Sequence, residues 1–360
     1  MSTTTASSAT LARAAASERA GGPSAVAAGR LVRFHVGGQP YALPLDRVAE
    51  VVALGSATAT APRGWVGTLA RNQRPVPIGD LAYLLGSGGQ AVTRRDMRAV
   101  MLRGKPTGGE VGAALFGVTV ESVPAVIDIG AAEAEALPTY AQRNASPIVR
   151  ASLIRDEELL LILDPDVIGE RLAVGVVRGA DGRVSELRAL PRRPNGDYHP
   201  APAGRSVAPD PPRRDTPVLL LRSVETADGD GGLLPAMPMG WVQEVRAMQA
   251  VRPLPHAPAG LSGVIAWRGR CLPVIDLIQR LTGIPSTGSA SQRMLIVGPQ
   301  AGPALGGMIV PGVRGLATIA GSPEGKPPVL PDTIDPGLLQ AWTRHGDDAV
   351  AILDPTTLFS

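Results

Sequence analysis

Residues 263–281 read GVIAWRGRCLPVIDLIQRL, and residues 67–85 read GTLARNQRPVPIGDLAYLL. The two stretches align without a gap at a constant offset of 196 residues, and seven of the 19 positions are identical. The identical pairs are Gly67/Gly263, Ala70/Ala266, Arg74/Arg270, Pro77/Pro273, Asp80/Asp276, Leu81/Leu277 and Leu85/Leu281. Because glycine, proline and leucine recur in one register over this length, the repeat indicates a duplicated structural unit and not a short linear signal.

The repeat extends on both sides of this stretch. The further matches are Glu50-Val51 with Glu244-Val245, and Ile162-Leu163-Asp164-Pro165 with Ile352-Leu353-Asp354-Pro355. At roughly 150 residues per domain, a chain of 360 residues has room for about two domains. We therefore predict two homologous domains. The predicted boundaries are a disordered tail at 1–29, a first domain at 30–172, a linker at 173–215 and a second domain at 216–360.

The tail and the linker differ from the domains in composition. The tail is mostly Ser, Thr, Ala and Gly, which favours disorder. Arg13, Glu18 and Arg19 interrupt any apolar run there, so we expect no secretory signal, while an organelle transit peptide remains an alternative. The linker is rich in proline and carries eight arginines and five acidic residues, a balance of +3 that equals the net charge of the whole chain.

This charge distribution bears on the partners. Neither domain interleaves basic residues with stacking aromatic residues, so we predict no nucleic-acid partner. No run of about 18 apolar residues occurs, so we predict no membrane-spanning segment.

The residue pattern favours mainly β structure. The chain has 43 glycines, 35 prolines and only 3% aromatic residues, which suits short strands separated by turns. Val32, Phe34 and Val36 alternate with more polar residues, and Gly37-Gly38 follows as a turn, so we expect a hairpin. The other predicted strands lie at 75–78, 115–120, 159–163, 218–221, 233–239, 272–275 and 305–310.

Four aspartates stand where an apolar strand gives way to a short helix. Two precede leucine and two precede proline, and proline suits the first position of a helix because its missing N–H costs nothing there. We predict that all four are helix N-caps. These residues are Asp80, Asp164, Asp276 and Asp354.

In these motifs the chain resembles the CheW-like adaptor domains of bacterial chemosensory systems. The second copy carries the most diagnostic residues, which are Glu244-Val245, Gly263-Val264-Ile265, Arg268-Gly269 and Pro273-Val274-Ile275-Asp276-Leu277. The first copy departs from the family pattern at Asn72-Gln73, where the family has Arg-Gly. Both copies also replace the family's Val-Asp, with Val120-Glu121 in the first and Val310-Pro311 in the second.

The resemblance implies a fold and a function. Each domain is expected to be a pair of SH3-like five-stranded β-barrels with short helices. The expected role is that of a non-catalytic adaptor that couples the cytoplasmic tips of chemoreceptors (methyl-accepting chemotaxis proteins) to the regulatory domain of a histidine kinase. Other CheW-like adaptors are possible partners. The resemblance implies a cytoplasmic protein that meets the membrane only through receptors and that uses no cofactor and no metal.

The resemblance also implies a receptor-binding groove. Its second-domain residues are Glu244, Val245, Ile265, Arg268 and Gly269, and the weaker first-domain set is Glu50, Val51 and Asn72. A glutamate and an arginine in one groove can exchange their mutual pairing for polar groups of an incoming helix. The alternative is an ordinary surface ion pair, worth about 0–1 kcal/mol. We hypothesise that the second domain binds receptors while the first binds the kinase or a neighbouring adaptor.

Other functions remain as alternatives. One is a scaffold for a non-flagellar pathway that controls surface motility or a second messenger. Another is a two-lobed β enzyme that uses Asp80 and Asp276, but neither aspartate begins the Asp-Thr-Gly or Asp-Ser-Gly sequence of the aspartic proteases. The four histidines lie in no phosphotransfer context, which disfavours a kinase. Cys271, the only cysteine, falls in a predicted buried strand and is expected to be a core residue.

Overall fold

The computed structural model describes residues 28–54, 64–71, 74–87, 97–104, 115–130, 133–174, 177–178, 184–185, 215–223, 234–319, 335–346 and 348–360. Most of the predicted tail, most of the predicted linker and Asn72 lie outside these ranges. The chain divides into two compact units. The first unit is Met1–Leu137 with Ile148–Ser185, and the second is Pro138–Pro147 with Glu186–Ser360.

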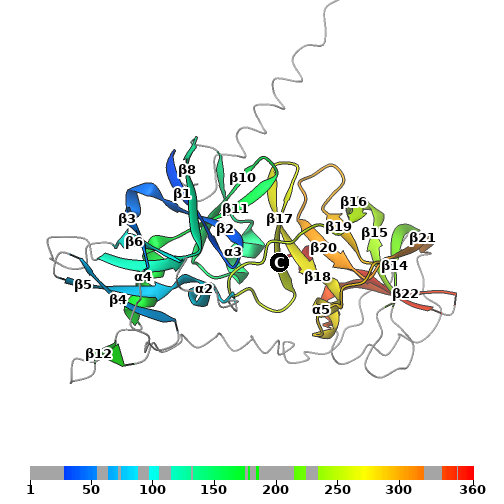
Figure 1. Cartoon of the computed structure of the whole chain (residues 1–360). Helices are drawn as coiled ribbons and strands as arrows, with labels where there is room; N and C mark the ends of the chain where they lie inside the picture. Colours follow the sequence, from blue (N-terminus) through cyan, green and yellow to red (C-terminus); the bar gives the residue numbers. More distant parts are fainter. Residues whose placement is uncertain are drawn as a thin grey trace, which may run out of the picture. The chain divides into compact units, whose positions relative to one another are not determined.

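The first unit contains a sheet of six strands and a sheet of five strands (Figure 1). The six-stranded sheet runs, in spatial order, β8 (Ser122–Ile129), β1 (Gly29–Val36), β2 (Gln39–Pro44), β11 (Glu158–Leu163), β10 (Val149–Arg155) and β9 (Ala134–Ala136). The five-stranded sheet runs β3 (Val48–Ala53), β6 (Arg98–Arg103), β7 (Leu115–Val120), β5 (Arg74–Asp80) and β4 (Trp65–Arg71). The β2–β11 and β5–β7 pairs are parallel, and the other pairs are antiparallel.

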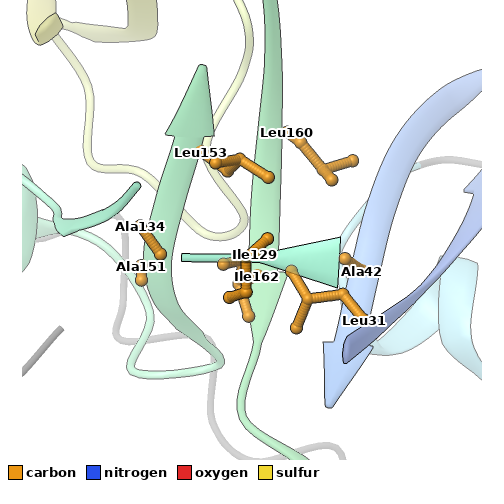
Figure 2. Close-up of a cluster of buried hydrophobic side chains, with 8 residues drawn as sticks. All are labelled: Leu31, Ala42, Ile129, Ala134, Ala151, Leu153, Leu160 and Ile162. Carbon is orange, nitrogen blue, oxygen red and sulfur yellow. The ribbon is translucent and has the colours of Figure 1, made fainter. Parts of the chain in front are cut away.

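Each sheet of the first unit has its own apolar core. Figure 2 shows the cluster of the six-stranded sheet, in which side chains from every strand of the sheet meet. Its members are Leu31, Ala42, Ile129, Ala134, Ala151, Leu153, Leu160 and Ile162. The cluster of the five-stranded sheet is Leu54, Val66, Val76, Ile78, Ala99 and Met101. Because every member of both clusters is buried, hydrophobic burial is the main term that stabilises each sheet.

The second unit repeats this arrangement with two five-stranded sheets. The first sheet runs β21 (Val313–Ile319), β14 (Thr216–Leu221), β15 (Leu234–Pro238), β23 (Asp348–Leu353) and β22 (Leu339–His345). The second runs β16 (Val242–Ala247), β19 (Arg293–Val297), β20 (Gly306–Val310), β18 (Arg270–Asp276) and β17 (Leu261–Trp267). The parallel pairs fall at the same places as in the first unit, at β15–β23 and β18–β20.

The two units therefore have the same strand order, and the prediction of mainly β structure is confirmed. Within the described ranges, the large sheets of the two units differ in strand number only at β9, which adds a sixth strand beside β10 in the first unit. In the second unit, the residues between β21 and β22 are described only from 335 onward. A two-stranded sheet, β12 (Val177–Arg178) with β13 (Val184–Ser185), lies in the first unit after the last helix.

The repeated glycine of the opening alignment allows two end strands of a sheet to meet. Arg252 and Val264 form an isolated antiparallel bridge in which each backbone N–H donates to the other's carbonyl at 2.8 Å, so the segment after β16 pairs with β17. Gly263 lies beside this bridge with φ +144°, and a Cβ there would be 2.1 Å from the Arg252 carbonyl oxygen. Only glycine fits this position. Gly67, its counterpart in the first unit, has φ 139°.

Short helices and turns connect the strands. The helices are α2 (Leu81–Leu84), α3 (Thr139–Asn144), α4 (Pro165–Val174), α5 (Leu277–Thr282) and α6 (Pro355–Leu358), and the 3₁₀ turns are η2 (Leu45–Arg47), η4 (Met239–Trp241) and η5 (Pro336–Leu338). The helix α3 belongs to the second unit, where the Tyr140 ring meets the Phe359 ring edge-on at 6.1 Å. Burial raises the pKa of Tyr140, and the charge of Arg280 partly opposes this rise. No helix in the described ranges combines the length and the apolar character needed to cross a bilayer.

The four predicted capping aspartates precede four of these helices, and each accepts hydrogen bonds from backbone N–H groups of the following turn. The acceptances are Asp80 from Ala82 and Tyr83, Asp164 from Asp166 and Val167, Asp276 from Gln279, and Asp354 from Thr356 and Thr357. Burial by itself would raise the pKa of Asp354. The hydrogen bonds from Thr356 and Thr357 outweigh burial and lower this pKa below its ordinary value.

The family departure at Glu121 has a structural explanation. The Glu121 carboxylate accepts hydrogen bonds from the backbone N–H groups of Gly37 at 2.7 Å and Gly38 at 2.9 Å, which form the turn between β1 and β2. Both glycines have positive φ, so their N–H groups point out of the strand pairing and need an acceptor. In the second unit Pro311 stands at this place, and its carbonyl accepts from the Ser291 hydroxyl at 2.9 Å.

Candidate functional site

The candidate site of the second unit begins at Glu244 on β16. The pairing of β16 with β19 shifts register between Val242 and Glu244, which is a β-bulge. Bulges turn a side chain away from the regular alternation of the strand. Glu244 lies on β16, the end strand of its sheet, and its side chain is about one-third exposed.

The partners of Glu244 come from the hairpin between β17 and β18. Trp267 ends β17 and Arg270 begins β18, so Arg268 and Gly269 form a two-residue turn. Their φ angles are +47° and +72°. Positive φ at both central residues matches the twist of tight hairpins, and glycine accommodates it easily while arginine rarely adopts it.

Three cationic or N–H groups surround the Glu244 carboxylate. The Trp267 indole Nε1 donates to Glu244 Oε2 at 3.0 Å, and Arg268 Nη2 lies 3.5 Å from the same oxygen. The Arg246 Nε lies 3.9 Å from Oε1. The Arg268 guanidinium carbon also lies 4.5 Å from the centre of the Trp267 ring, within the range of a cation–π contact. The carboxylate thus joins β16 to the β17–β18 hairpin.

Exposure decides which of these groups an incoming partner can reach. The Arg268 side chain is 70% exposed and Val245 is 44% exposed, whereas Trp267 is only 8% exposed. Gly269 lies at the open tip of the turn, where a Cβ would meet no atom within 4 Å. We call Glu244, Val245, Trp267 and Arg268 the second-unit site.

Ile265 requires a correction. The resemblance places it among the groove residues that a partner contacts, but it is 1% exposed. It belongs to the buried cluster of Ile265, Trp267, Leu272, Val274, Met294, Ile296 and Ile309. Side chains alternate across a strand, and the Ile265 side chain points into the core. The exposed apolar contact at this site falls to Val245 instead.

The first unit has a corresponding site with one unexpected member. β3 pairs β6 with a register shift between Val48 and Glu50, the same bulge that precedes Glu244. The Glu50 Oε1 lies 2.5 Å from the Nε of Arg71, the last residue of β4. Val51, beside Glu50, is 37% exposed. We call Glu50, Val51 and Arg71 the first-unit site.

Arg71 was missed because the family pattern directs attention to Asn72, the counterpart of Arg268. In the gapless alignment Arg71 stands opposite Trp267, and both end the first strand of their hairpin. Asn72 itself lies outside the described residues. An arginine next to the expected position was the signal in the sequence, because an N–H donor from the same strand end can reach the same glutamate.

The described residues give little support to an enzyme site, a reactive cysteine or a metal site. Asp80 and Asp276, the carboxylates of the alternative enzyme, cap helices, and Asp276 Oδ2 also accepts from the Ser286 backbone N–H at 2.9 Å and from its hydroxyl at 2.6 Å. Cys271 is buried and forms no disulfide. Across the described ranges, no three His, Cys, Asp or Glu side chains gather as a group that could hold a metal ion.

Comparisons with known proteins agree with this architecture. A model of the family described as "CheW-like domain" matches residues 30–172 and 231–360. The chain is 36% identical over 78 residues to a "Probable chemotaxis protein CheW" of Rhizobium etli, and 34% identical over 79 residues to "Chemotaxis protein CheW" of Rhizobium meliloti. These alignments cover 22% of this chain and 49% and 50% of the two relatives, so the chain spans about half the length of the curated relatives it matches.

Among solved structures, the chain is similar to scaffolding protein TtCheW from Thermoanaerobacter tengcongensis, with 19% identity and a TM-score of 0.33 over 46% of this chain and 95% of that one. The two family matches cover well over half of the sequence. The first falls on the pair of sheets of the first unit, and the second falls on the pair of sheets of the second unit except for β14, which precedes residue 231. The predicted class, mainly β with two CheW-like domains in tandem, is thereby confirmed. The chain belongs to the CheW-like domain family and carries two copies of that domain.

Proposed function

We propose that this protein is a non-catalytic adaptor of a chemosensory pathway. It couples chemoreceptors to a histidine kinase in the cytoplasm, and it binds the receptor tip through the second-unit site. Membership of the CheW-like family supports the adaptor role, since the matched relatives are named as chemotaxis proteins. The observation that carries the site is the Glu244 carboxylate, which lies on the end strand of its sheet and is contacted by Trp267 and Arg268.

The geometry of this site suits an exchange of the Arg268–Glu244 contact for contacts with a partner better than it suits a stabilising role in the fold. A surface ion pair contributes about 0–1 kcal/mol to folding, and the Arg268 side chain is 70% exposed, so the pair does little for the fold. The Arg268 Nη2 to Glu244 Oε2 separation of 3.5 Å is also at the long limit of a hydrogen bond. An incoming helix that offers a carboxylate to Arg268 replaces this weak contact with a stronger one.

Two features prepare the site for a helix. The indole N–H of Trp267 fixes the Glu244 carboxylate at 3.0 Å, so the acceptor stays in place when Arg268 turns to a partner. Val245, 44% exposed and next to Glu244 in the chain, provides the apolar surface on which a helix face can pack. A polar pair beside an exposed apolar side chain fits an amphipathic helix of a partner.

The test is a binding titration of the full chain with a soluble fragment that carries the cytoplasmic tip of a chemoreceptor from the same organism. Arg268→Ala is expected to weaken the binding attributable to the second unit at least tenfold, about 1.4 kcal/mol. The melting temperature should change by no more than a few degrees.

The matched control is Arg314→Ala. Arg314 is also an exposed arginine of the second unit, with a side chain 52% exposed and paired to Asp348 at 2.5 Å in the other sheet. Its substitution removes the same charge and should leave binding unchanged. A pull-down with the full chain should recover the kinase with both variants. Equal binding by Arg268→Ala and the wild type would refute the proposed site.

A further inference from the structure

The helix α3 falls within the first family match, residues 30–172, but it packs in the second unit. Residues 138–147 belong to that unit, whereas the first unit runs up to Leu137 and resumes at Ile148. We propose that this segment is a clasp, a short helix that the second unit binds and that the Phe359 ring holds in place. The clasp is independent of the proposed adaptor role.

Helix α3 is too short to persist without a partner. It spans six residues, and isolated helices of fewer than about 12–15 residues are marginal in water. Its N-cap residue, Pro138, offers no side-chain acceptor to the first turn. Tyr140 and Ala141 are 6% and 0% exposed, so tertiary packing holds the helix instead. Order in this segment therefore depends on its contacts with the rest of the second unit.

Two contacts attach the segment near its two ends. Near its start, the Tyr140 ring meets the Phe359 ring edge-on, with the ring centres 6.1 Å apart. Near its end, the backbone N–H of Ser146 donates to the Pro255 carbonyl at 3.2 Å. The helix between these contacts lies against β17. Because Ser146 is only 7% exposed, loss of the Pro255 contact would leave a buried N–H group unpaired.

The Phe359 ring can make its contact because the two units carry a phenylalanine and a glycine in reversed positions. In the first unit Phe116 on β7 lies against Gly169 of α4, where a Cβ would come within 3.0 Å of the ring. In the second unit the glycine is Gly306 on β20, and a Cβ there would come within 2.3 Å of the Phe359 ring.

Backbone register shows that these positions are equivalent. Phe116 and Gly306 each stand one residue before the parallel pairing begins, in β5–β7 and in β18–β20. Gly169 and Phe359 each lie five residues after the capping aspartate of their helix. Each unit thus has one ring at this place, supplied by a strand in the first unit and by the residue after α6 in the second.

The reversal changes what the ring can reach. Phe116 is 6% exposed and enclosed in its unit, whereas Phe359 is only partly buried. At the end of α6, the Phe359 ring covers Gly306 and also meets Tyr140. An edge-on pair of aromatic rings is worth about 0.5–1.5 kcal/mol beyond the area that it buries. The reversed pair therefore gives the second unit an aromatic contact that can retain α3.

Hydrogen exchange of the full chain, followed by mass spectrometry, tests the clasp. In the wild type the amides of residues 139–146 should exchange at least tenfold more slowly than those of an unstructured chain. Phe359→Leu removes the ring but keeps an apolar side chain, and it should speed this exchange at least tenfold. Tyr140→Leu should do the same. The double variant should add little, because both substitutions remove one contact.

Two references accompany this experiment. Phe116→Leu removes the counterpart ring of the first unit and should leave the exchange of α3 unchanged. Strand β23 lies in the same unit as Phe359, and its exchange should change less than twofold in Phe359→Leu. Faster exchange of α3 alone supports the clasp.

Three results would overturn it. A wild-type α3 that exchanges as fast as an unstructured chain would mean that the second unit does not bind the segment. An α3 that is unaffected by Phe359→Leu would mean that the ring does not hold it. Equal acceleration in α3 and β23 would mean that Phe359 acts as a core residue of the whole unit and not through α3.

Discussion

The second-unit site and the first-unit site contain equivalent glutamates, Glu244 and Glu50, whose carboxylates are contacted by different side chains. Glu244 receives an indole N–H and two arginines, one of which lies over the indole ring. Glu50 receives a single arginine at 2.5 Å. The backbone that positions them is the same in both units, down to the bulge before the glutamate. Duplication therefore kept the scaffold, while the donors around the carboxylate were exchanged.

The largest effect is expected from the glycine that lets the end strands of the second unit meet. Gly263→Ala forces a Cβ to within 2.1 Å of the Arg252 carbonyl oxygen at φ +144°, so backbone must move. Strain and overpacking together should lower the free energy of unfolding by about 3 kcal/mol or more. Differential scanning calorimetry should show one of two transitions move to lower temperature.

The control for this substitution is Gly269→Ala. Gly269 also has positive φ, at +72°, but a Cβ there meets nothing within 4 Å. Its cost should be limited to the left-handed backbone, about 1–2 kcal/mol. Gly67→Ala should affect the other transition, because Gly67 has φ 139° in the first unit. A Gly263→Ala protein as stable as Gly269→Ala would show that the close approach is not needed.

The second prediction converts one site into the other. Arg71→Trp combined with Asn72→Arg gives the first unit the donor set of the second. The pair of substitutions is made in the Arg268→Ala background, in which the second-unit site is weakened, so that a gain can be assigned to the first unit. The cation–π contact and the freed arginine should strengthen receptor-tip binding up to about tenfold. Titration calorimetry measures the change. Weaker binding by the converted protein would mean that Arg71 is better suited to its site than the indole.

The third prediction separates stability from binding within the same repeat. Asp276 caps α5 and also accepts two hydrogen bonds from Ser286, so Asp276→Ala should cost about 2 kcal/mol of unfolding free energy. Asp80 accepts from two backbone N–H groups at the start of α2, so Asp80→Ala should cost about 1 kcal/mol. Chemical denaturation measures both. If either variant lost receptor binding while keeping its stability, that aspartate would belong to the binding site and not to the helix cap.

The smallest effect concerns Asp354, whose folded-state pKa is lowered. A carboxylate with a lowered folded pKa stabilises the fold above its unfolded pKa, about 3.9, and this contribution disappears as pH falls through the folded pKa. Asn is also a good cap, so Asp354→Asn should differ from the wild type by less than about 1 kcal/mol near pH 7. The difference should shrink as pH is lowered from 5 to 3. A gap that widens over this range would contradict the sign.

Much of the fold was readable from the sequence because its signals are local. Alternation at Val32, Phe34 and Val36 and the Gly37-Gly38 turn predicted a hairpin that the structure contains as β1 and β2. The aspartates before leucine and proline occupy helix N-termini because capping depends only on the next few residues. The extra strand β9 was not anticipated, since Ala134–Ala136 is too short to show a period.

The site was harder to read because its contacts cross from one strand end to another. Glu244 and Arg268 do lie together, but the indole N–H of Trp267 between them needed three-dimensional coordinates. The family pattern places Ile265 in the groove, but alternation along β17 buries its side chain. The family motif fixes the arginine at the position of Asn72, so it does not select Arg71, one residue earlier. The arginine side chain is long enough to reach Glu50 from that neighbouring position.

The two-residue turn at Arg268-Gly269 also bears on how such a domain can diversify. Adding one residue would turn the two-residue turn into a three-residue loop, which needs a different backbone conformation at the tip. The gapless alignment of the two copies through Asn72-Gln73 shows that both copies have kept the same length here. New partner preferences here must arise by replacement of side chains at a fixed backbone length, so descendants of this domain should differ at the tip in residue identity far more often than in loop size.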